Sequence, residues 1–349
     1  MNQKERLLAA CRNQPVDRVP VWIMRQAGRA LPGYRALRER RSFLELCKTP
    51  ELAAEVSAEP IEALGVDAAI VFSDILVVAE AMGLRLEVSD AGPVLDGFAP
   101  DREGISRLGE FDPERETGYV GQAIRQLARR LGPEIPVIGF AGAPWTLACY
   151  MLARREDANT AHRARQMLFA DPALLHALLE KIARATGLYL AAQIRAGAAV
   201  VQLFDTWAGE LNRPSYEAFA LPATRLVIET LQPGSTPVIL YARGGGHIVE
   251  AMAQTGATVL SVDWRTGLSE TRRRLGPNLA LQGNVDPYAL LGPVEAIERA
   301  AREAVEQTGG AGHILNLGHG LLPMTPLEHA RAFVQAGQSA AIGRGPRAD

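Results

Sequence analysis

The sequence has few of the residues that build disulfide frameworks and metal centres. Its 349 residues include three cysteines and six histidines, all scattered, and none of the histidines pairs with a cysteine at metal-ligand spacing. This composition argues against a disulfide scaffold and a zinc site, and it fits a reducing cytosol. The first residues, Met1 to Arg6, are charged or polar before any apolar run, so we expect no secretory signal and a cytoplasmic protein.

Long uncharged runs are also scarce. Residues 135–153 lack charged side chains for nineteen residues, which by length alone would cross a membrane. Pro136, Gly139, Gly142 and Pro144 interrupt this run and predict a strand, a turn and a helix instead. We therefore predict no membrane segment and no membrane partner.

The chain has no excess of either charge, but its positive charge is concentrated locally. A formal net charge of −2 and a pI near 6.4 argue against a nucleic-acid partner. Six arginines fall between Arg25 and Arg41, with only Glu39 to offset them. Guanidinium groups bind carboxylate or phosphate through paired N–H donors, so this segment predicts a small anionic ligand. For Arg35 to Arg41 a solvated basic surface is an equally good interpretation.

Eight short apolar runs alternate with helical patterns along the chain, which predicts a parallel sheet covered by helices on both faces. Eight such strands indicate a single-domain α/β fold over residues 1–349, a (β/α)₈ TIM barrel, with an open doubly wound sheet as the alternative. The expected strands are Pro20–Met24, Ala68–Phe72, Val137–Phe140, Val200–Phe204, Val238–Tyr241, Val259–Val262, Leu279–Gln282 and Ile314–Leu317.

Two segments depart from a plain repeat. Leu84–Val88 and Pro93–Phe98 predict a small hairpin inserted after the second strand, and Asn159–Ala196 predicts a long helical stretch. Helix starts are expected at Thr49-Pro50-Glu51, Asp171-Pro172 and Thr325-Pro326, where a capping residue precedes proline.

In a barrel, chemistry belongs at the carboxyl ends of the strands, and polar residues follow every expected strand. Asp74 stands out because Phe72, Ile75 and Leu76 flank it, so its carboxyl group is expected to be partly desolvated and either paired or used. The other candidates are Arg25, Arg29, the segment Trp145 to Tyr150, Asp205, Thr206, Arg243, Asp263, Asn284 and His319.

Several of these residues also have plain structural interpretations. Asp263 is more readily a helix cap than a functional acid. His319 lies between Gly318 and Gly320, which lets a ligand approach closely, although a structural histidine remains an alternative. The triple glycine that begins at Gly244 is a weak phosphate-binding signal.

At these residues the chain resembles the uroporphyrinogen decarboxylase family of haem biosynthesis. The two most specific segments are Pro20 to Arg29 (PVWIMRQAGR) and Gly139 to Tyr150 (GFAGAPWTLACY), because long ordered strings of this kind rarely arise by chance. Phe72 to Ile75, Phe204 to Gly209 and Asn316 to Gly320 fit in the same order. The resemblance runs from about Arg6 to Ala336. Thr206 stands where relatives often have serine, and Arg154 where a small residue or lysine is usual.

The resemblance implies a cofactor-free carboxy-lyase with no metal, usually a homodimer. Its substrate is uroporphyrinogen III, a cyclic tetrapyrrole with eight carboxylates, whose four acetates become methyls to give coproporphyrinogen III. Asp74, Arg25 and Arg29 would be catalytic. Substrate contacts are implied for Arg25, Gln26, Ala27, Gly28, Arg29, Phe43, Asp74, Tyr150, Thr206 and His319.

The expected roles differ. Asp74 would accept pyrrole N–H bonds and stabilise a cationic ring, Arg25 and Arg29 would hold carboxylates, and Tyr150, Thr206 and His319 would bind the propionate and acetate arms. Phe43 would pack on a pyrrole face, or it is a core phenylalanine. Two alternatives remain at this stage: a zinc-dependent methyltransferase of the related cobalamin-linked barrels, and a non-catalytic tetrapyrrole-binding protein.

Overall fold

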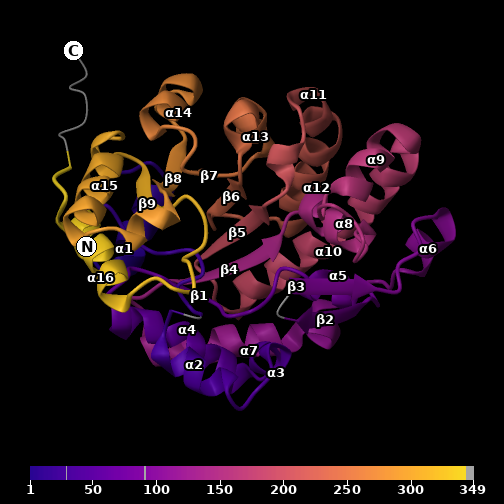
Figure 1. Cartoon of the computed structure of the whole chain (residues 1–349), viewed down its shortest axis with the longest axis horizontal. Coiled ribbons are helices and arrows are strands. Elements are labelled where there is room, and N and C mark those ends of the chain that lie inside the picture. The colour runs from indigo at the N-terminus through magenta and orange to yellow at the C-terminus, as the bar shows by residue number, and fades with distance from the viewer. Residues whose placement is uncertain (29, 90–91, 343–349) are drawn as a thin grey trace.

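A curled parallel sheet lies at the centre of the computed structural model, which describes residues 1–28, 30–89 and 92–342 (Figure 1). Seven strands follow one another in the order of the chain, except for an inserted hairpin. They are β1 (Ala69–Ile70), β4 (Val137–Gly142), β5 (Val200–Asp205), β6 (Val238–Ala242), β7 (Val259–Val262), β8 (Ala280–Val285) and β9 (His313–Leu317). All neighbouring pairs are parallel, which confirms the predicted α/β barrel class.

The expected first strand, Pro20–Met24, is not part of the ladder, and some other bounds also differ: β1 is shorter than predicted and β4 and β8 are longer. The segment is buried and extended, but a single parallel bridge, Val21 to Leu315, joins it to β9. On its other side, the Asp67 N–H donates to the Val21 carbonyl at 2.7 Å, just before β1. The segment therefore closes the barrel between β9 and β1 without forming a ladder.

Side chains replace the missing ladder bonds. The N–H groups of Val21, Ile23 and Met24 donate to Asp67 Oδ2, Gln26 Oε1 and Asn316 Oδ1, at 2.8, 3.0 and 2.9 Å. Since these donors are satisfied by side chains, the segment needs no strand partner at those positions.

A polar layer inside the barrel ties the same segment to the opposite strands. Trp22 Nε1 donates to Gln282 Oε1 at 2.9 Å, and Gln282 Nε2 donates to Gln202 Oε1 and Ser261 Oγ at 3.0 and 2.9 Å. All four side chains are fully buried. Their hydrogen bonds offset the cost of placing amides in a core.

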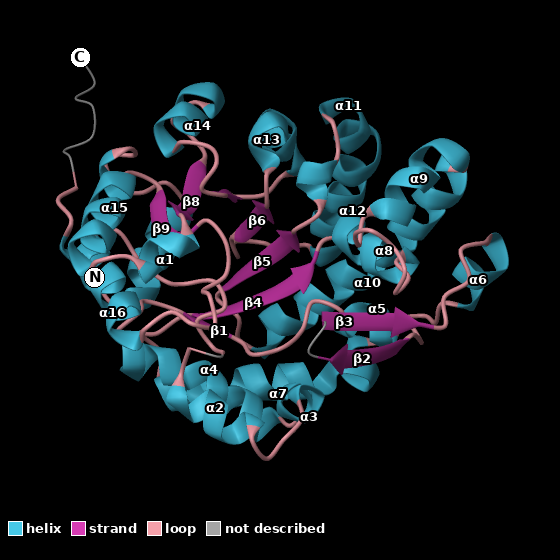
Figure 2. Cartoon of the chain, in the orientation of Figure 1, coloured by secondary structure: helices cyan, strands magenta, loops and turns pink. Residues whose placement is uncertain are grey.

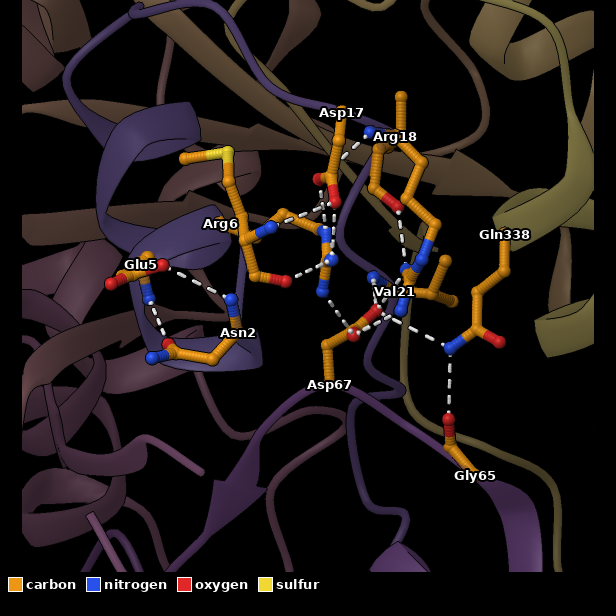
Figure 3. Close-up of polar contacts among 11 residues, drawn as sticks. Asn2, Glu5, Arg6, Asp17, Arg18, Val21, Gly65, Asp67 and Gln338 are labelled. Carbon is orange, nitrogen blue, oxygen red and sulfur yellow. Dashed lines mark hydrogen bonds and ion pairs between the residues drawn. The ribbon is translucent and has the colours of Figure 1, made fainter. Parts of the chain in front are cut away.

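At the amino end of the barrel, Asp67 is the centre of a buried ion-pair cluster (Figure 3). Its two oxygens accept hydrogen bonds from the Arg18 guanidinium at 2.7 Å each and from Arg6 Nη1 at 3.3 Å. Gln338 Nε2 approaches Asp67 Oδ2 at 3.4 Å from the last helix. The carboxylate thus connects both ends of the chain to the closing segment.

Helices surround the sheet, and Figure 2 shows them as the outer layer around the strands. They are α1 (Gln3–Cys11), α2 (Pro32–Arg38), α3 (Phe43–Lys48), α4 (Pro50–Leu64), α5 (Val77–Ala81), α6 (Arg102–Arg107), α7 (Pro113–Leu131), α8 (Pro144–Leu152), α9 (His162–Ala170), α10 (Pro172–Ala196), α11 (Arg213–Ser215), α12 (Leu221–Leu231), α13 (Val249–Met252), α14 (Leu268–Leu275), α15 (Val294–Glu306) and α16 (Leu327–Ser339).

The three predicted helix starts are found, but the capping interaction differs from one helix to the next. Asp171 caps α10 as expected, since its carboxylate accepts from Leu174 N–H at 3.0 Å. Thr49 occupies the cap position of α4 but makes no capping hydrogen bond, so that expectation was wrong, and Pro50 at the first helical position sets the start instead. The predicted helix after Thr325 begins at Leu327, with Pro326 as its cap.

The predicted hairpin is confirmed within about two residues at each end. Strands β2 (Arg85–Ser89) and β3 (Gly92–Asp96) pair antiparallel, with Arg85 opposite Asp96 and Val88 opposite Pro93. The hairpin follows α5 and projects beside the barrel towards α6 in Figure 1.

We expect Asp67→Asn to lower the free energy of unfolding by about 3 kcal/mol, because Arg6 and Arg18 lose a buried counter-charge. Asp17→Asn is the matched control: Asp17 also pairs with Arg6, but its side chain is 44% exposed, so its loss should stay below about 1 kcal/mol. Urea denaturation measures both. Equal losses would contradict the role given to Asp67 in closing the barrel.

Candidate active site

A cavity of about 740 Å³ lies at the carboxyl end of the barrel, where a barrel enzyme places its chemistry. Its wall comes from the closing segment, the residues that follow β1, the ends of β4 and β5, and the turn after β9. Val88 and Pro93 of the hairpin complete one side. The cavity therefore collects residues from segments far apart in the sequence.

Arg25 lines this cavity at the point where the closing segment ends. Its φ of 61° turns the chain out of the extended path. Behind it, the Leu321 N–H donates to the Met24 carbonyl at 2.8 Å and fixes the turn after β9 against the loop. Gly320 is required here, since a Cβ atom at that position would lie 2.2 Å from Arg25 Cδ. We expected Gly320 to let a ligand approach His319 closely; in the structure it leaves room for the side chain of Arg25.

The other arginines of the cluster divide into two groups. Arg38, at the end of α2, lines the cavity, while Arg35, Arg40 and Arg41 are exposed. The solvated-surface interpretation therefore holds for those three and not for Arg38. Arg29, predicted to be catalytic and to bind substrate, lies outside the described residues.

Asp74 lines the same cavity, as expected. Its Oδ1 accepts a hydrogen bond from the Leu76 N–H at 2.8 Å, which closes a tight local turn. Burial raises the pKa of the carboxyl group above its ordinary value, although the Leu76 N–H and the charge of Arg25 act in the opposite direction. Asp74 and Arg25 form no ion pair within 4 Å, so the two charges interact across the cavity.

Aromatic rings form much of the apolar wall. Phe43, the first residue of α3, packs edge-on against Phe72 with ring centroids 5.5 Å apart. Phe140 and Phe204, from β4 and β5, pack edge-to-face at 5.6 Å. All four line the cavity, so Phe43 both supports Phe72 and faces the space a ligand would fill.

The remaining predicted residues are found at different depths. Thr206, Ala27 and Gly28 line the cavity. Gln26 does not, because its buried amide is used by the backbone: besides accepting from Ile23 N–H, it donates to the Ala68 carbonyl at 2.7 Å.

Tyr150, on α8, is also absent from the cavity wall. It is half-buried, lies within electrostatic range of Asp74 and Arg25, and burial raises the pKa of its phenol.

His319 lines the cavity, and its ring stacks on Tyr241 of β6 at 6.0 Å between centroids. Burial and the nearby charges of Arg25, Arg243 and Arg265 lower the pKa of the imidazole to about 3. The imidazole is therefore neutral at neutral pH. Tyr241 could not be singled out from the sequence, because a tyrosine at the end of an apolar strand looks the same as an ordinary core residue.

Asp263 is hydrogen-bonded to the first residue of the triple glycine. Asp263 Oδ2 accepts from the Gly244 N–H at 2.7 Å and pairs with the Arg265 guanidinium, while Oδ1 accepts from the Arg265 N–H. Asp263 is thus a structural residue, but the expected helix cap was wrong, because α14 begins at Leu268 after Gly267 and has no side-chain capping hydrogen bond. The Gly244 N–H is bonded to Asp263 and is not free to bind a phosphate.

Asp205, at the end of β5, is buried behind Thr206. Thr146 Oγ1 donates to its Oδ1 at 2.7 Å, and its Oδ2 has no hydrogen-bond partner. Burial raises the pKa of this carboxyl group to about 7. Asp205 thus supports the wall from behind and carries a proton over much of the acidic range.

In residues 1–28, 30–89 and 92–342, no three His, Cys, Asp or Glu side chains are grouped so that they could hold a metal ion. All three cysteines are free and buried. Within the same ranges, none of the helices is both long and apolar enough to cross a membrane.

We expect Asp205→Asn to change how stability depends on pH. In the folded protein the pKa is raised from 3.8 to about 7, so wild-type stability falls as pH rises between these values. Asparagine does not titrate. The free energy of unfolding of Asp205→Asn, relative to wild type, should therefore rise by about 3 kcal/mol between pH 5 and pH 8 in urea denaturation. A difference that does not change with pH would contradict this assignment.

Comparisons with known proteins were made for the whole chain. The family model described as uroporphyrinogen decarboxylase (URO-D) matches residues 2–340. Uroporphyrinogen decarboxylase of Geobacter metallireducens is 46% identical over 331 residues, covering 95% of this chain and 97% of the relative. That of Trichlorobacter lovleyi is 47% identical over 330 residues, covering 94% and 96%.

Solved structures share the fold. A methyltransferase from Methanosarcina mazei superposes with a TM-score of 0.78 at 25% identity, covering 97% of this chain and 98% of that one. A B12-independent methionine synthase from Shewanella sp. W3-18-1 superposes with a TM-score of 0.59 at 10% identity, covering 86% and 89%. The sequence matches over nearly the whole length confirm the resemblance: this chain belongs to the uroporphyrinogen decarboxylase family.

Proposed function

We propose that this protein decarboxylates the four acetate side chains of uroporphyrinogen III to methyl groups, giving coproporphyrinogen III, without a metal or organic cofactor. The observation that carries the proposal is a cavity lined both by a partly desolvated carboxyl group, Asp74, and by a cation, Arg25, that forms no ion pair with a described residue. Family membership supports the same substrate.

The charges around the cavity suit a polycarboxylate. Arg25 has no ion pair with any described residue, and Arg38 adds a second guanidinium to the wall. Arg25 is exposed and Arg38 is half-buried, and each guanidinium offers a carboxylate forked donors that stay charged at any working pH. Arg29, four residues after Arg25 in the sequence, is proposed to hold a further carboxylate.

The shape and apolar lining suit pyrrole rings. A cavity of about 740 Å³ lies within the usual size of ligand pockets. Phe43, Phe72, Phe140 and Phe204 present ring faces and edges on which flat pyrroles pack. We propose that Phe43 contacts one pyrrole face.

The chemistry needs an electron sink, and the substrate provides it. Protonation of a pyrrole ring carbon gives a cationic ring. When the C–C bond to the carboxylate breaks, CO₂ leaves and its bonding electrons neutralise that ring. The exocyclic carbon then takes a proton to become a methyl group, while the ring carbon gives up the proton it had gained. The protein therefore has to stabilise a positive charge that exists only during the reaction.

Asp74 is placed for this task. One oxygen is fixed by the Leu76 N–H, which leaves the other free to accept pyrrole N–H bonds. Phe72, Ile75 and Leu76 lower the local dielectric, so an ionised carboxylate interacts strongly with the developing cation. Pairing with the cation also favours the ionised form that burial disfavours.

The remaining assignments follow the family resemblance. We propose that Thr206 and His319 contact the propionate and acetate arms at the cavity wall, with Ala27 and Gly28 offering backbone contacts. Tyr150 would act through its charge environment near Asp74 and Arg25, and Gln26 through the backbone that it holds. A single catalytic domain, a homodimeric state, a cytoplasmic location and the absence of a nucleic-acid partner stay predictions.

We expect the protein to convert uroporphyrinogen III to products with fewer carboxylates under anaerobic conditions in chelator-treated buffer, and Asp74→Asn to lower turnover by about a hundredfold. That loss corresponds to roughly 3 kcal/mol of transition-state stabilisation. Asparagine keeps the shape and still accepts from Leu76 N–H, so the change removes only the charge. Chromatography by carboxylate number measures both.

Asp286→Asn is the matched control. Asp286 makes the same two-residue turn, accepting from the Tyr288 N–H at 3.0 Å, but does not line the cavity, so its turnover should match wild type. A folded Asp74→Asn protein with nearly full activity would refute the role of Asp74. Binding without loss of carboxylates would favour a non-catalytic tetrapyrrole-binding protein, and activity restored only by zinc would favour the methyltransferase alternative.

A further inference from the structure

Two hydrogen-bond contacts of one buried hydroxyl group determine where His319 carries its proton. Tyr241 is fully buried, and its hydroxyl oxygen lies 3.0 Å from the Gly318 carbonyl oxygen and 2.8 Å from His319 Nδ1. The carbonyl can only accept, so the single phenolic proton is donated to Gly318.

The imidazole must then supply the proton of the second contact. With its own proton on Gly318, the Tyr241 oxygen can only accept from His319, which requires an N–H at Nδ1. The reverse arrangement would leave two oxygens 3.0 Å apart with no proton between them. Tyr241 keeps its phenolic proton at neutral pH, because burial raises the pKa of its phenol above the ordinary value.

The other ring nitrogen, Nε2, has no hydrogen-bond partner among the described residues, and His319 lines the cavity. Three arginines face this imidazole: Arg25 from the closing segment, Arg243 after β6 and Arg265 after β7. Among the described residues, the acid whose charge acts on Tyr241 is Asp263, which is already paired with Arg265. These surroundings keep the imidazole neutral, so Nε2 carries a lone pair.

We propose that Tyr241 is a positioning residue that fixes His319 as the Nδ1–H tautomer and so presents the Nε2 lone pair to the cavity. The tautomer is a property of the free protein. Its consequence for the ligand rests on the proposed function: Nε2 accepts an N–H or O–H proton of the substrate and does not donate to a carboxylate.

The assignment restricts the contact proposed above between His319 and the propionate and acetate arms: an arm can meet Nε2 only through a protonated carboxyl group. A neutral imidazole with its lone pair in the cavity repels a carboxylate and attracts a pyrrole N–H or a protonated carboxylic acid. Arg25 and Arg38 remain the groups that bind carboxylates. His319 therefore binds an N–H or O–H group of the substrate, and Tyr241 causes this preference by fixing the tautomer of His319.

The test is a long-range ¹H–¹⁵N spectrum of ¹⁵N-histidine-labelled protein at neutral pH, with His319 assigned by its loss in His319→Gln. We expect a protonated Nδ1 and an unprotonated Nε2. His313 is an internal reference for the opposite tautomer, because its Nε2 lies 2.8 Å from the Gly283 carbonyl and must carry the proton.

Tyr241→Phe should shift His319 towards the Nε2–H tautomer and lower kcat/KM by about three- to tenfold, the effect of one lost hydrogen bond. Tyr216→Phe is the matched control: Tyr216 is equally buried, but its hydroxyl group has no partner. Both the tautomer and kcat/KM should be unchanged in that variant.

A wild-type His319 protonated at Nε2 would overturn the proposal, and this outcome needs no variant to fold and no substrate to turn over. An unchanged His319 signal in Tyr241→Phe would overturn the role of Tyr241. A changed tautomer with wild-type kcat/KM would overturn the role in recognition. Failure of the decarboxylase reaction itself leaves the tautomer result intact, so the two proposals are tested separately.

Discussion

The site depends on how the barrel closes. Between β9 and β1 the chain contributes an extended segment whose N–H groups are bonded by Asp67, Gln26 and Asn316 instead of by a neighbouring strand. A full strand would continue along the barrel wall. Because side chains provide these bonds, the backbone can turn at Arg25, with its positive φ, and direct the arginine into the cavity.

A second consequence of this closure is electrostatic. The loop brings Arg25 to one side of the cavity, while the residues after β1 hold Asp74 among Phe72, Ile75 and Leu76. Neither charge is neutralised by an ion pair with a described residue. Both therefore remain available to a charged ligand, and the apolar neighbours of Asp74 reduce the screening of its charge. The positive charge near the site also keeps His319 neutral, so burial and the charge of Arg25 affect the pKa of both Asp74 and His319.

Much of this could be predicted from the sequence, for identifiable reasons. Mostly apolar runs such as Val200–Phe204 predicted the strands, because a strand that is buried on both faces does not alternate between apolar and polar residues. Asp74 was recognisable because its neighbours in the chain are also its neighbours in space. Arg25 was recognisable because it directly follows such a run.

The misses have a common cause, since each depends on contacts between distant segments. Nothing near Pro20–Met24 shows that Asp67 and Asn316 will take its N–H groups. Tyr241 looks like core until His319, 78 residues later, is placed beside it. Gln26 and Tyr150 lie in the right motifs, but neither lines the cavity, because the packing of the barrel sets which side chains reach it.

The most direct measurement of the central claim is the pKa of Asp74 itself. Carboxyl ¹³C shifts of ¹³C-aspartate-labelled protein, with Asp74 assigned by its loss in Asp74→Asn, report its titration in the absence of substrate. The account predicts a pKa above the ordinary aspartate value, because burial dominates, and a still higher pKa in Arg25→Gln, because the cation across the cavity is gone. An ordinary pKa that does not respond to Arg25→Gln would contradict the claim that these two groups interact in a desolvated cavity.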